Sequence, residues 1–323
     1  MKNTSFLKLR SFFSLLVYSL VIFILLSCSF FQRRLPDKKE DAAPKKYKEI
    51  YKIKAPPGVK NSKKSNKVAR KESEVKEVAI EVAQEKSLLT PGEVFVYTAG
   101  WTMFSVGTAE VSIEPSIMVN DVPSSHIHVL GKTNEFFSGI YNAEINIDLF
   151  MNAVTLKPYK LELNSRESKF LRNHIAVFDY VNKKASYWSK SIKLTKSGKE
   201  KVYEAEYGIM DDLIDSLSPA FQVRKWTLQE GKKIAFHVLE NEKIYKIQCD
   251  VLRKEKKEVL QKMEDAFYVE CVFKVVKAKK WKDKYKEESK LWAWFSDDPK
   301  HYLIEAGAKV TVGSVSLQLI DRK

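Results

Sequence analysis

The sequence of 323 residues has few of the features on which common catalytic sites are built. It contains three cysteines and five histidines, and it has no G-x-S-x-G, H-E-x-x-H, P-loop or dinucleotide-binding motif. It therefore carries no signal of the common serine hydrolases, zinc metalloproteases or nucleotide-dependent enzymes. From these absences we predict no cofactor and no catalytic residue, and enzymatic activity is the less favoured interpretation.

Acidic residues are also in deficit, with 41 Asp and Glu against 56 Lys and Arg. Residues 1–30 have 3 basic and no acidic residues, residues 31–90 have 17 against 9, and residues 91–323 have 36 against 32. A nucleic-acid-binding protein carries its positive charge on the folded domain, so nucleic acid is not a predicted partner. The Lys-rich segment suits anionic lipid or an anionic envelope polymer. A solvated tether whose charges prevent collapse explains it equally well.

The N-terminus has the pattern of an export signal. Three basic residues occur within the first ten, residues 11–26 are mostly apolar, and Leu25-Leu26-Ser27-Cys28 follows. The end of this pattern resembles the lipobox of bacterial lipoproteins, which implies removal of residues 1–27 and acylation of Cys28. Several acyl chains hold a protein firmly to a membrane, because each buried CH₂ contributes about 0.8 kcal/mol. The alternatives are an ordinary signal peptide and a single transmembrane anchor.

The residue after the lipobox bears on the location of the protein. Ser29 is not the Asp that often signals retention in the inner membrane. We therefore predict a lipid-anchored protein of the cell envelope, on the outer membrane and facing the periplasm, with the membrane as a partner through lipidated Cys28.

Residues 28–88 form a predicted tether that is rich in lysine and contains four prolines. Such a segment buries too little surface to offset the entropy of ordering it. As a coil of about 60 residues it would span roughly 40–50 Å. The folded domain is predicted at residues 89–323, beginning near Thr90-Pro91-Gly92.

Alternation of apolar and polar residues dominates this domain. Short runs rich in Val, Ile, Tyr and Phe are separated by Gly, Asn and Lys turns, which indicates an all-β, mainly antiparallel fold. A curved sheet, a sandwich or a half-barrel would satisfy the pattern. One short helix is expected around 211–221, with Pro219 ending or following it. The expected strands are 94–99, 108–113, 126–129, 144–150, 159–164, 175–180, 185–188, 201–206, 233–239, 244–252, 267–277, 290–295, 302–306 and 309–320.

Three ordered motifs make the domain similar to a known family. They are Gly92-Glu93-x-Phe95-x-Tyr97-x-x-x-Trp101 with Val106-Gly107-x-Ala109, then Asp212-x-x-x-Asp215-x-Leu217-Ser218-Pro219-Ala220-Phe221 with Arg224, and finally Leu291-Trp292-Ala293-Trp294-Phe295-Ser296-Asp297-Asp298-Pro299-Lys300 with Val312-Gly313-Ser314. The set resembles a family of exported bacterial proteins catalogued as domain of unknown function 3108. The resemblance implies an exported β-rich domain over about 91–321, and it implies no activity.

One departure from the family concerns charge. Lys300 stands where the family often has Arg, which puts a charge-pairing role of that position in doubt. The resemblance gives structural motif positions at Gly107, Asp212, Arg224, Asp297, Asp298 and Gly313.

The pair Asp297-Asp298 is the most enzyme-like element, because two carboxylates can hold a metal or share a proton. Adjacent residues of a strand point to opposite faces, however, and Ser-Asp-Asp-Pro is typical of a turn. We predict a turn, and a hydrolase or metal enzyme that uses the two residues is the weaker alternative. Asp211, Asp212 and Asp215 are expected to cap the predicted helix.

Two histidines are spaced so that they share one face of a strand. His126 and His128 could bind zinc, but a third ligand is needed. His174, His237 and His301 lie far away in the sequence, so no metal site is predicted.

Four aromatic residues are candidates for ligand binding. Trp292 and Trp294 share a strand face, as do Tyr97 and Trp101. Core packing is the simplest explanation. The functional alternative is an aromatic-lined concavity in a curved sheet, which would accept acyl chains or glycan.

The cysteines other than Cys28 are Cys249 and Cys271. With strand pairing centred near residue 260 they would face each other across a hairpin. Two reduced core cysteines and a disulfide both remain open.

The sequence as a whole favours a non-catalytic, membrane-anchored lipoprotein whose β domain binds an apolar ligand or an envelope polymer. The alternative is a structural or assembly factor that acts through a protein interface with another envelope protein. The ligand and the partner are not specified by the sequence.

Overall fold

The computed structural model describes residues 44, 46–47, 51–54, 87–194, 198–278, 289–310 and 312–323. The predicted signal peptide, Cys28 and most of the predicted tether lie outside the described residues. Strands account for 66% of the structure and helices for 6%, which confirms the all-β, mainly antiparallel class. Among the described residues, no helix is long and apolar enough to cross a membrane.

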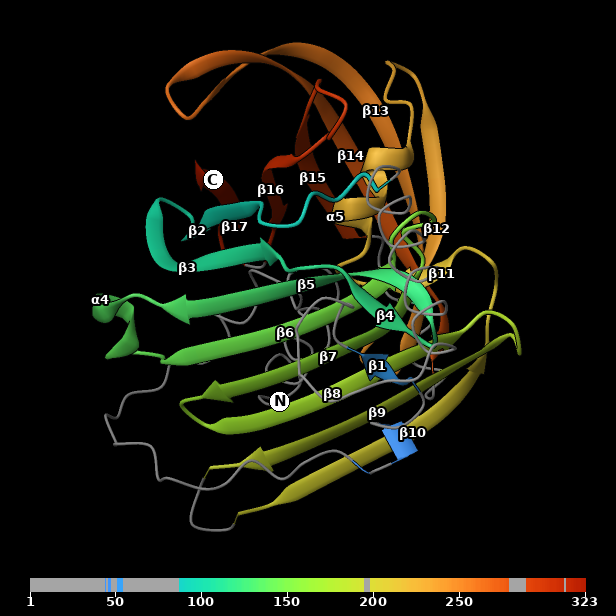
Figure 1. Cartoon of the computed structure of the whole chain (residues 1–323). Helices are drawn as coiled ribbons and strands as arrows, with labels where there is room; N and C mark the ends of the chain where they lie inside the picture. The colour runs from blue at the N-terminus through green and yellow to red at the C-terminus, as the bar shows by residue number, and fades with distance from the viewer. Residues whose placement is uncertain are drawn as a thin grey trace, which may run out of the picture.

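The described strands form one open sheet (Figure 1). The hydrogen-bonded ladder runs β11-β12-β13-β14-β15-β16-β17-β2-β3-β5-β6-β7-β8-β9-β10, and within it the β11–β12 pair is parallel while the others are antiparallel. Strand β4 extends the ladder from β5, and β1 pairs with β4. The bounds are β1 Ile53–Lys54, β2 Val94–Trp101, β3 Phe104–Ile113, β4 Ile117–Val119, β5 Val122–Thr133, β6 Ala143–Asn152, β7 Pro158–Glu167, β8 Phe170–Asp179, β9 Lys184–Lys193, β10 Glu200–Gly208, β11 Leu213–Asp215, β12 Lys233–Glu240, β13 Lys243–Val259, β14 Lys262–Ala278, β15 Ser289–Ser296, β16 Leu303–Lys309 and β17 Ser314–Arg322.

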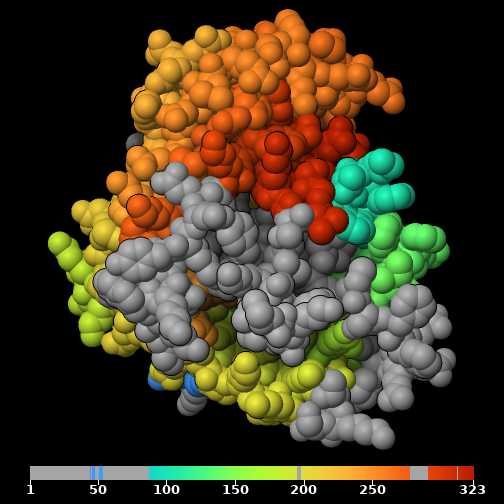
Figure 2. Space-filling model, turned by 180° about the vertical axis from the view of Figure 1, so that it is seen from behind, coloured from blue at the N-terminus to red at the C-terminus, as the bar shows by residue number. Residues whose placement is uncertain are grey.

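The sheet is strongly curved. Strands β5 to β10 lie side by side in one half, while β13 and β14 arch over the other (Figure 1). Seen from behind, the C-terminal strands (red) lie between the β13–β14 hairpin (orange) above and yellow atoms of β9 and β10 at the lower edge (Figure 2). The curvature brings β11 against β7, and the Tyr180 hydroxyl donates a hydrogen bond to the carbonyl of Leu213 at 2.8 Å. The sheet therefore curves back on itself, but the hydrogen-bonded ladder of described strands does not continue all the way around.

Two-residue turns fix the register of three hairpins. Both turn residues have positive φ at Asn120–Asp121 (49° and 64°), Asn241–Glu242 (44° and 68°) and Leu260–Gln261 (48° and 65°). Turns of this kind match the twist of the flanking strands. Asn and Asp adopt the left-handed backbone readily, so two of these turns follow from residue type, whereas Leu260–Gln261 does not.

The core lies on the concave face, where alternate residues of successive strands are buried. The buried residues of this face come from successive strands and are each at most 5% exposed. They include Phe95 and Tyr97 of β2, Val111 of β3, Ile127 of β5 and Ile147 of β6. A second buried cluster joins β8 and β9 to β11, β12 and β13 where the two ends of the ladder meet. Burial of alternate residues is the pattern that the sequence predicted.

The short helix is present, but it begins later than the sequence suggested. Leu213–Asp215 form β11, and the helix α5 covers Pro219–Gln222, followed by the 3₁₀ turn η2 at Val223–Lys225. Pro219 begins the helix and does not end it, because its fixed φ suits the first turn and its missing N–H has no partner to lose there. Just before α5, the Asp215 carboxylate accepts backbone N–H bonds from Leu217 and Ser218, both at 2.8 Å. A second four-residue helix, α4, covers Glu135–Ser138.

Cys249 and Cys271 occupy facing positions of β13 and β14, as pairing near residue 260 predicted. The structure joins them in a disulfide with Cα atoms 4.0 Å apart. Both are buried, so the bond ties the two strands together inside the core.

Reduction of this disulfide in the wild-type protein is expected to lower the free energy of unfolding by up to about 3 kcal/mol. The two cysteines are 22 residues apart, and the reduced chain regains in the unfolded state the freedom that closing this loop removes. Urea unfolding of the oxidised and reduced protein measures the difference with the same side chains in place. An intact mass that does not change by two hydrogens on reduction would contradict the disulfide.

Candidate functional site

The three sequence motifs converge on the carboxylate of Glu93. One terminal nitrogen of Arg224 lies 3.2 Å from Glu93 Oε2 and donates a 2.6 Å hydrogen bond to the carbonyl of Leu88. The ammonium of Lys300 donates to Glu93 Oε1 and also to the hydroxyl of Thr90, the latter at 3.3 Å. Glu93, immediately before β2, thus binds two cations with one carboxylate. Arg224 comes from η2 and Lys300 from the β15–β16 turn. Lys300 forms a charge pair even though the family often has Arg at this position.

Burial makes these charges interdependent. The Arg224 side chain is 1% exposed, and its Nε has no hydrogen-bond partner among the described residues. Burial by itself would raise the pKa of Glu93, but the hydrogen bond from Lys300 and the charge of Arg224 outweigh it and lower the pKa below its ordinary value. Glu93 therefore stays ionised and compensates the buried guanidinium.

Asp297 and Asp298 lie in a turn between β15 and β16. Asp298 Oδ1 accepts backbone N–H bonds from Lys300 at 2.8 Å and His301 at 3.0 Å. Asp297 forms an ion pair with Lys254. The two carboxylates thus have separate structural partners, as expected for a turn.

The other motif residues also have structural surroundings. Gly313 has φ 83°, and a Cβ there would lie 2.3 Å from the hydroxyl oxygen of Thr102, so both conformation and space require glycine. Gly107 lies in β3 opposite Ala99. Asp212 pairs with His237, with 2.8 Å between Oδ2 and Nδ1, and so caps no helix.

The four candidate aromatic residues all lie in or against the main buried cluster. Tyr97 is buried and its hydroxyl donates to the carbonyl of Leu303 at 3.0 Å. The indole N–H of Trp101 donates to the carbonyl of Val312 at 3.0 Å. Trp292 packs on Gly307, where a Cβ would lie 2.4 Å from the indole ring.

Trp294 is 8% exposed and belongs to the same buried cluster as Leu291 and Ala293. Its ring is 4.9 Å from that of Tyr268, and the ammonium of Lys257 lies 4.7 Å from the ring centre. This packing agrees with the simplest explanation given above for the four residues, and a ligand-binding concavity lined by them stays a prediction. Helix α5 fills the space beside Tyr97, where a cavity of about 40 Å³ remains, which holds about one water molecule.

A larger cavity of about 540 Å³ lies between strands β8–β10 and the β12–β13 turn. Arg172 and four lysines line it, and Glu242 is the one carboxylate among its described lining residues. His174, which also lines it, is buried, and its pKa is lowered to about 4 by this burial and by the charge of Arg172, so the imidazole is neutral at pH 7. The lysines are Lys190, Lys193, Lys199 and Lys201.

Sequence reasoning missed this cavity. Its four lysines lie close together in the sequence, within residues 190–201, but Arg172 joins them only through the long-range pairing of β8 with β9. Arg172 has an acidic partner in Glu167 at 3.4 Å, and Lys190 has one in Glu200 at 3.3 Å. The other three lysines form no ion pair with a described residue. A net positive charge thus remains in the cavity.

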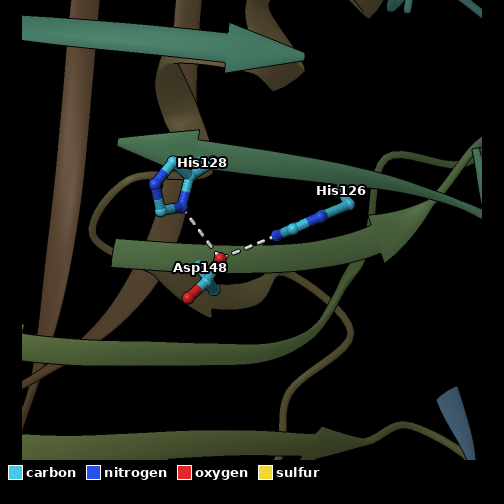
Figure 3. Close-up of side chains that lie close together, drawn as sticks. All are labelled: His126, His128 and Asp148. Carbon is cyan, nitrogen blue, oxygen red and sulfur yellow. Dashed lines mark hydrogen bonds and ion pairs between the residues drawn. The ribbon is translucent and has the colours of Figure 1, made fainter. Parts of the chain in front are cut away.

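A third group joins the two candidate histidines to an aspartate that the sequence did not single out. Figure 3 shows His126 and His128 of β5 both directed at Asp148 of β6. The cross-strand register, which places Asp148 opposite His128, supplies this third residue. Alternation along 144–150 predicts which face of the strand Asp148 lies on, but not which strand pairs with it. Local spacing alone therefore could not identify Asp148 as the third residue of this group.

Comparison with known proteins identifies the family. The model of the family described as "Protein of unknown function (DUF3108)" matches residues 96–320. The chain belongs to this family. No curated protein matches the chain.

Solved structures related to this DUF3108 chain are distant. A β-barrel-like protein of domain of unknown function DUF1849 from Brucella abortus has 6% identity and a TM-score of 0.40, over 72% of this chain and 96% of that one. A presumed lipoprotein from Parabacteroides distasonis has 9% identity and a TM-score of 0.32, over 74% and 99%. A presumed exported protein with a YmcC-like fold from Bacteroides fragilis has 7% identity and a TM-score of 0.32, over 72% and 96%. These similarities are too low to carry an argument about function.

Substitution Glu93→Gln is expected to lower the free energy of unfolding by about 3 kcal/mol at pH 7, because it leaves the buried Arg224 guanidinium without a counter-charge. The folded pKa of Glu93 is lowered, so its contribution is present above the unfolded pKa and is lost as the pH falls through the folded value. The variant should therefore lose part of the pH dependence of stability as well.

Denaturant unfolding between pH 3 and 7 measures both effects. Glu110→Gln, an exposed carboxylate on β3, is the control and should leave stability within about 0.5 kcal/mol. Equal stability of the two variants would contradict the role assigned to Glu93.

Proposed function

We propose that this protein is a lipid-anchored protein of the cell envelope whose β domain is a non-catalytic binding module for an anionic ligand. The cavity of about 540 Å³ with its five cationic side chains carries the proposal. Its volume lies within the range typical of small-molecule sites. The ligand class is the anionic repeat unit of an envelope polymer, such as a phosphorylated or carboxylated sugar.

The local charge supports an anion in this cavity. Residues 91–323 have nearly equal numbers of basic and acidic residues, 36 against 32, so a cavity with five cations and one carboxylate departs from the average of the domain. Lys193, Lys199 and Lys201 are exposed, so an anion from solvent can reach them, and its attraction to them is expected to weaken with added salt. Phe170 and Leu163 add apolar lining for the ring of a sugar.

The anchor and the tether complete the proposal. The lipobox-like sequence before Cys28 supports acylation of that residue. Tyr47 is 2% exposed and Ile53–Lys54 pair with β4, so residues 28–43 would separate the anchor from the domain, by roughly 20–24 Å as a coil. We assign the anchor to the outer membrane, facing the periplasm, because Ser29 follows Cys28. The lysines of the tether would attract anionic lipid or the same polymer.

A second candidate function is that of an assembly factor with a protein partner. The β2–β3 turn and α4 expose Met103 (82%), Phe104 (53%) and Phe136 (76%). The ring of Phe137 lies 6.3 Å from that of Phe104 and 5.1 Å from that of Phe136, so these residues form one apolar patch. Apolar patches of this kind mark interaction surfaces.

The double substitution Lys193→Gln and Lys201→Gln is expected to weaken binding of glucose 1-phosphate by the full-length protein at least about tenfold, because two charges leave the cavity. The wild-type protein should bind the phosphate more tightly than neutral glucose, and added salt should weaken this binding. Calorimetric titration measures each case. Lys232→Gln with Lys233→Gln removes the same charge from the far end of β12 and should leave binding unchanged. An equal loss of affinity in both variants, or no preference for glucose 1-phosphate over glucose, would refute the proposal that this cavity binds the anion.

Substitution Cys28→Ser is expected to abolish palmitate incorporation in cells and to release the protein from the membrane fraction, because the lipid attachment atom is lost. Radiolabelled palmitate and fractionation measure this. A chain with Cys249→Ala and Cys271→Ala should keep the label, and a labelled Cys28→Ser chain would contradict the anchor.

A further inference from the structure

Two histidines and one aspartate form a compact cluster at the β5–β6 pair. His126 Nε2 lies 2.8 Å from Asp148 Oδ1, and His128 Nδ1 lies 3.0 Å from the same oxygen. The two rings approach the carboxylate from one side of the sheet (Figure 3). The three side chains are 22%, 25% and 26% exposed, so solvent reaches the cluster.

We propose that His126, His128 and Asp148 form a binding site for a divalent transition-metal ion, with zinc as the best match. One ligand atom from each residue lies within 4.8 Å of the other two. A tetrahedral zinc ion with bonds of about 2.0–2.1 Å separates its ligand atoms by roughly 3.4 Å. Small side-chain rotations therefore bring the three atoms into coordination, and water fills the fourth position.

The protein holds these side chains close to that geometry without a metal. Both histidines lie on β5 and Asp148 lies opposite His128 on β6, within the continuous ladder. The ring of Phe150 stacks on that of His126 with centroids 4.6 Å apart and an interplanar angle of 12°. A preorganised site loses little conformational entropy when the metal binds.

The set of ligand atoms also indicates which metals the site would prefer. A carboxylate ligand neutralises one charge of a divalent ion. Two imidazoles and one carboxylate favour zinc, copper and nickel over magnesium and calcium, which prefer oxygen ligands alone.

The metal-free alternative is a simple hydrogen-bonded group, and the two differ in where the ring protons lie. Without metal, His126 Nε2 and His128 Nδ1 each need a proton to donate to Asp148. With metal, those nitrogens hold the ion through their lone pairs, so the protons move to His126 Nδ1 and His128 Nε2. The positions of the protons thus report directly on metal binding.

The chain contains a natural control in the pair formed by His237 and Asp212. Its Nδ1 and Oδ2 atoms are 2.8 Å apart, which repeats the contact of His128 with Asp148 but has no second histidine. The proposal requires that the three-residue cluster binds zinc and that this two-residue pair does not.

The test is a zinc titration of the full-length, metal-stripped protein in detergent, in competition with a chromophoric chelator. The wild type and His237→Gln are expected to bind one equivalent, and Asp148→Asn and His128→Gln are expected to bind at least about 100-fold more weakly, because each loses one of three ligands. Cobalt bound to the wild type should give the visible spectrum of a tetrahedral site. Zinc affinity that is unchanged in Asp148→Asn, or no saturable binding to the wild type, would overturn the proposal.

A second measurement covers variants that fail to fold. Nitrogen NMR of the wild-type histidine rings, with and without zinc, reads the protonated nitrogen of each ring directly. The expected change is the move of the ring protons of His126 and His128 on zinc addition, with His237 unaffected. Ring protons that stay in place at saturating zinc would exclude coordination by these residues.

Discussion

The carboxylate of Glu93 connects parts of the chain that are far apart in sequence. Arg224 from η2 and Lys300 from the β15–β16 turn both bind it at the entrance to β2. The Arg224 side chain is 1% exposed, so its charge is tolerable in the interior only with this counter-charge and the carbonyl of Leu88. The contact holds α5 and η2 inside the curve of the sheet. The space beside Tyr97 is thereby filled, and the larger cavity lies where the other end of the ladder meets β12 and β13.

The sequence predicted the class and most strands of this fold because alternation is a local signal. It underestimated the β13–β14 hairpin, expected as 244–252 and 267–277, because residues 253–258 between these runs are all charged and show no alternation of apolar and polar side chains. It also placed the helix too early. Leu213, Ile214 and Leu217 together have helical spacing. Leu213 and Ile214 nevertheless pair with residues of β12, a long-range contact that local spacing does not contain.

The sites were less accessible to sequence reasoning than the fold. The motifs contained Glu93, Arg224 and Lys300, but their meeting point depends on the curvature of the sheet. Alternation put His126 and His128 on one face correctly, while Asp148 became visible only through the register of β5 with β6. The strand pattern placed the four candidate aromatic residues on faces of their strands, but it does not contain the long-range packing of α5 beside Tyr97.

The most direct measurement of the central claim is native mass spectrometry of the full-length protein, extracted gently from membranes in detergent. A binding module for anionic envelope material should retain an adduct whose mass fits a phosphorylated or carboxylated saccharide, and this adduct should dissociate at high salt because the cavity holds it by charge. A mass without such an adduct at low salt, with a second protein bound in equal amount, would contradict the account and favour an assembly factor.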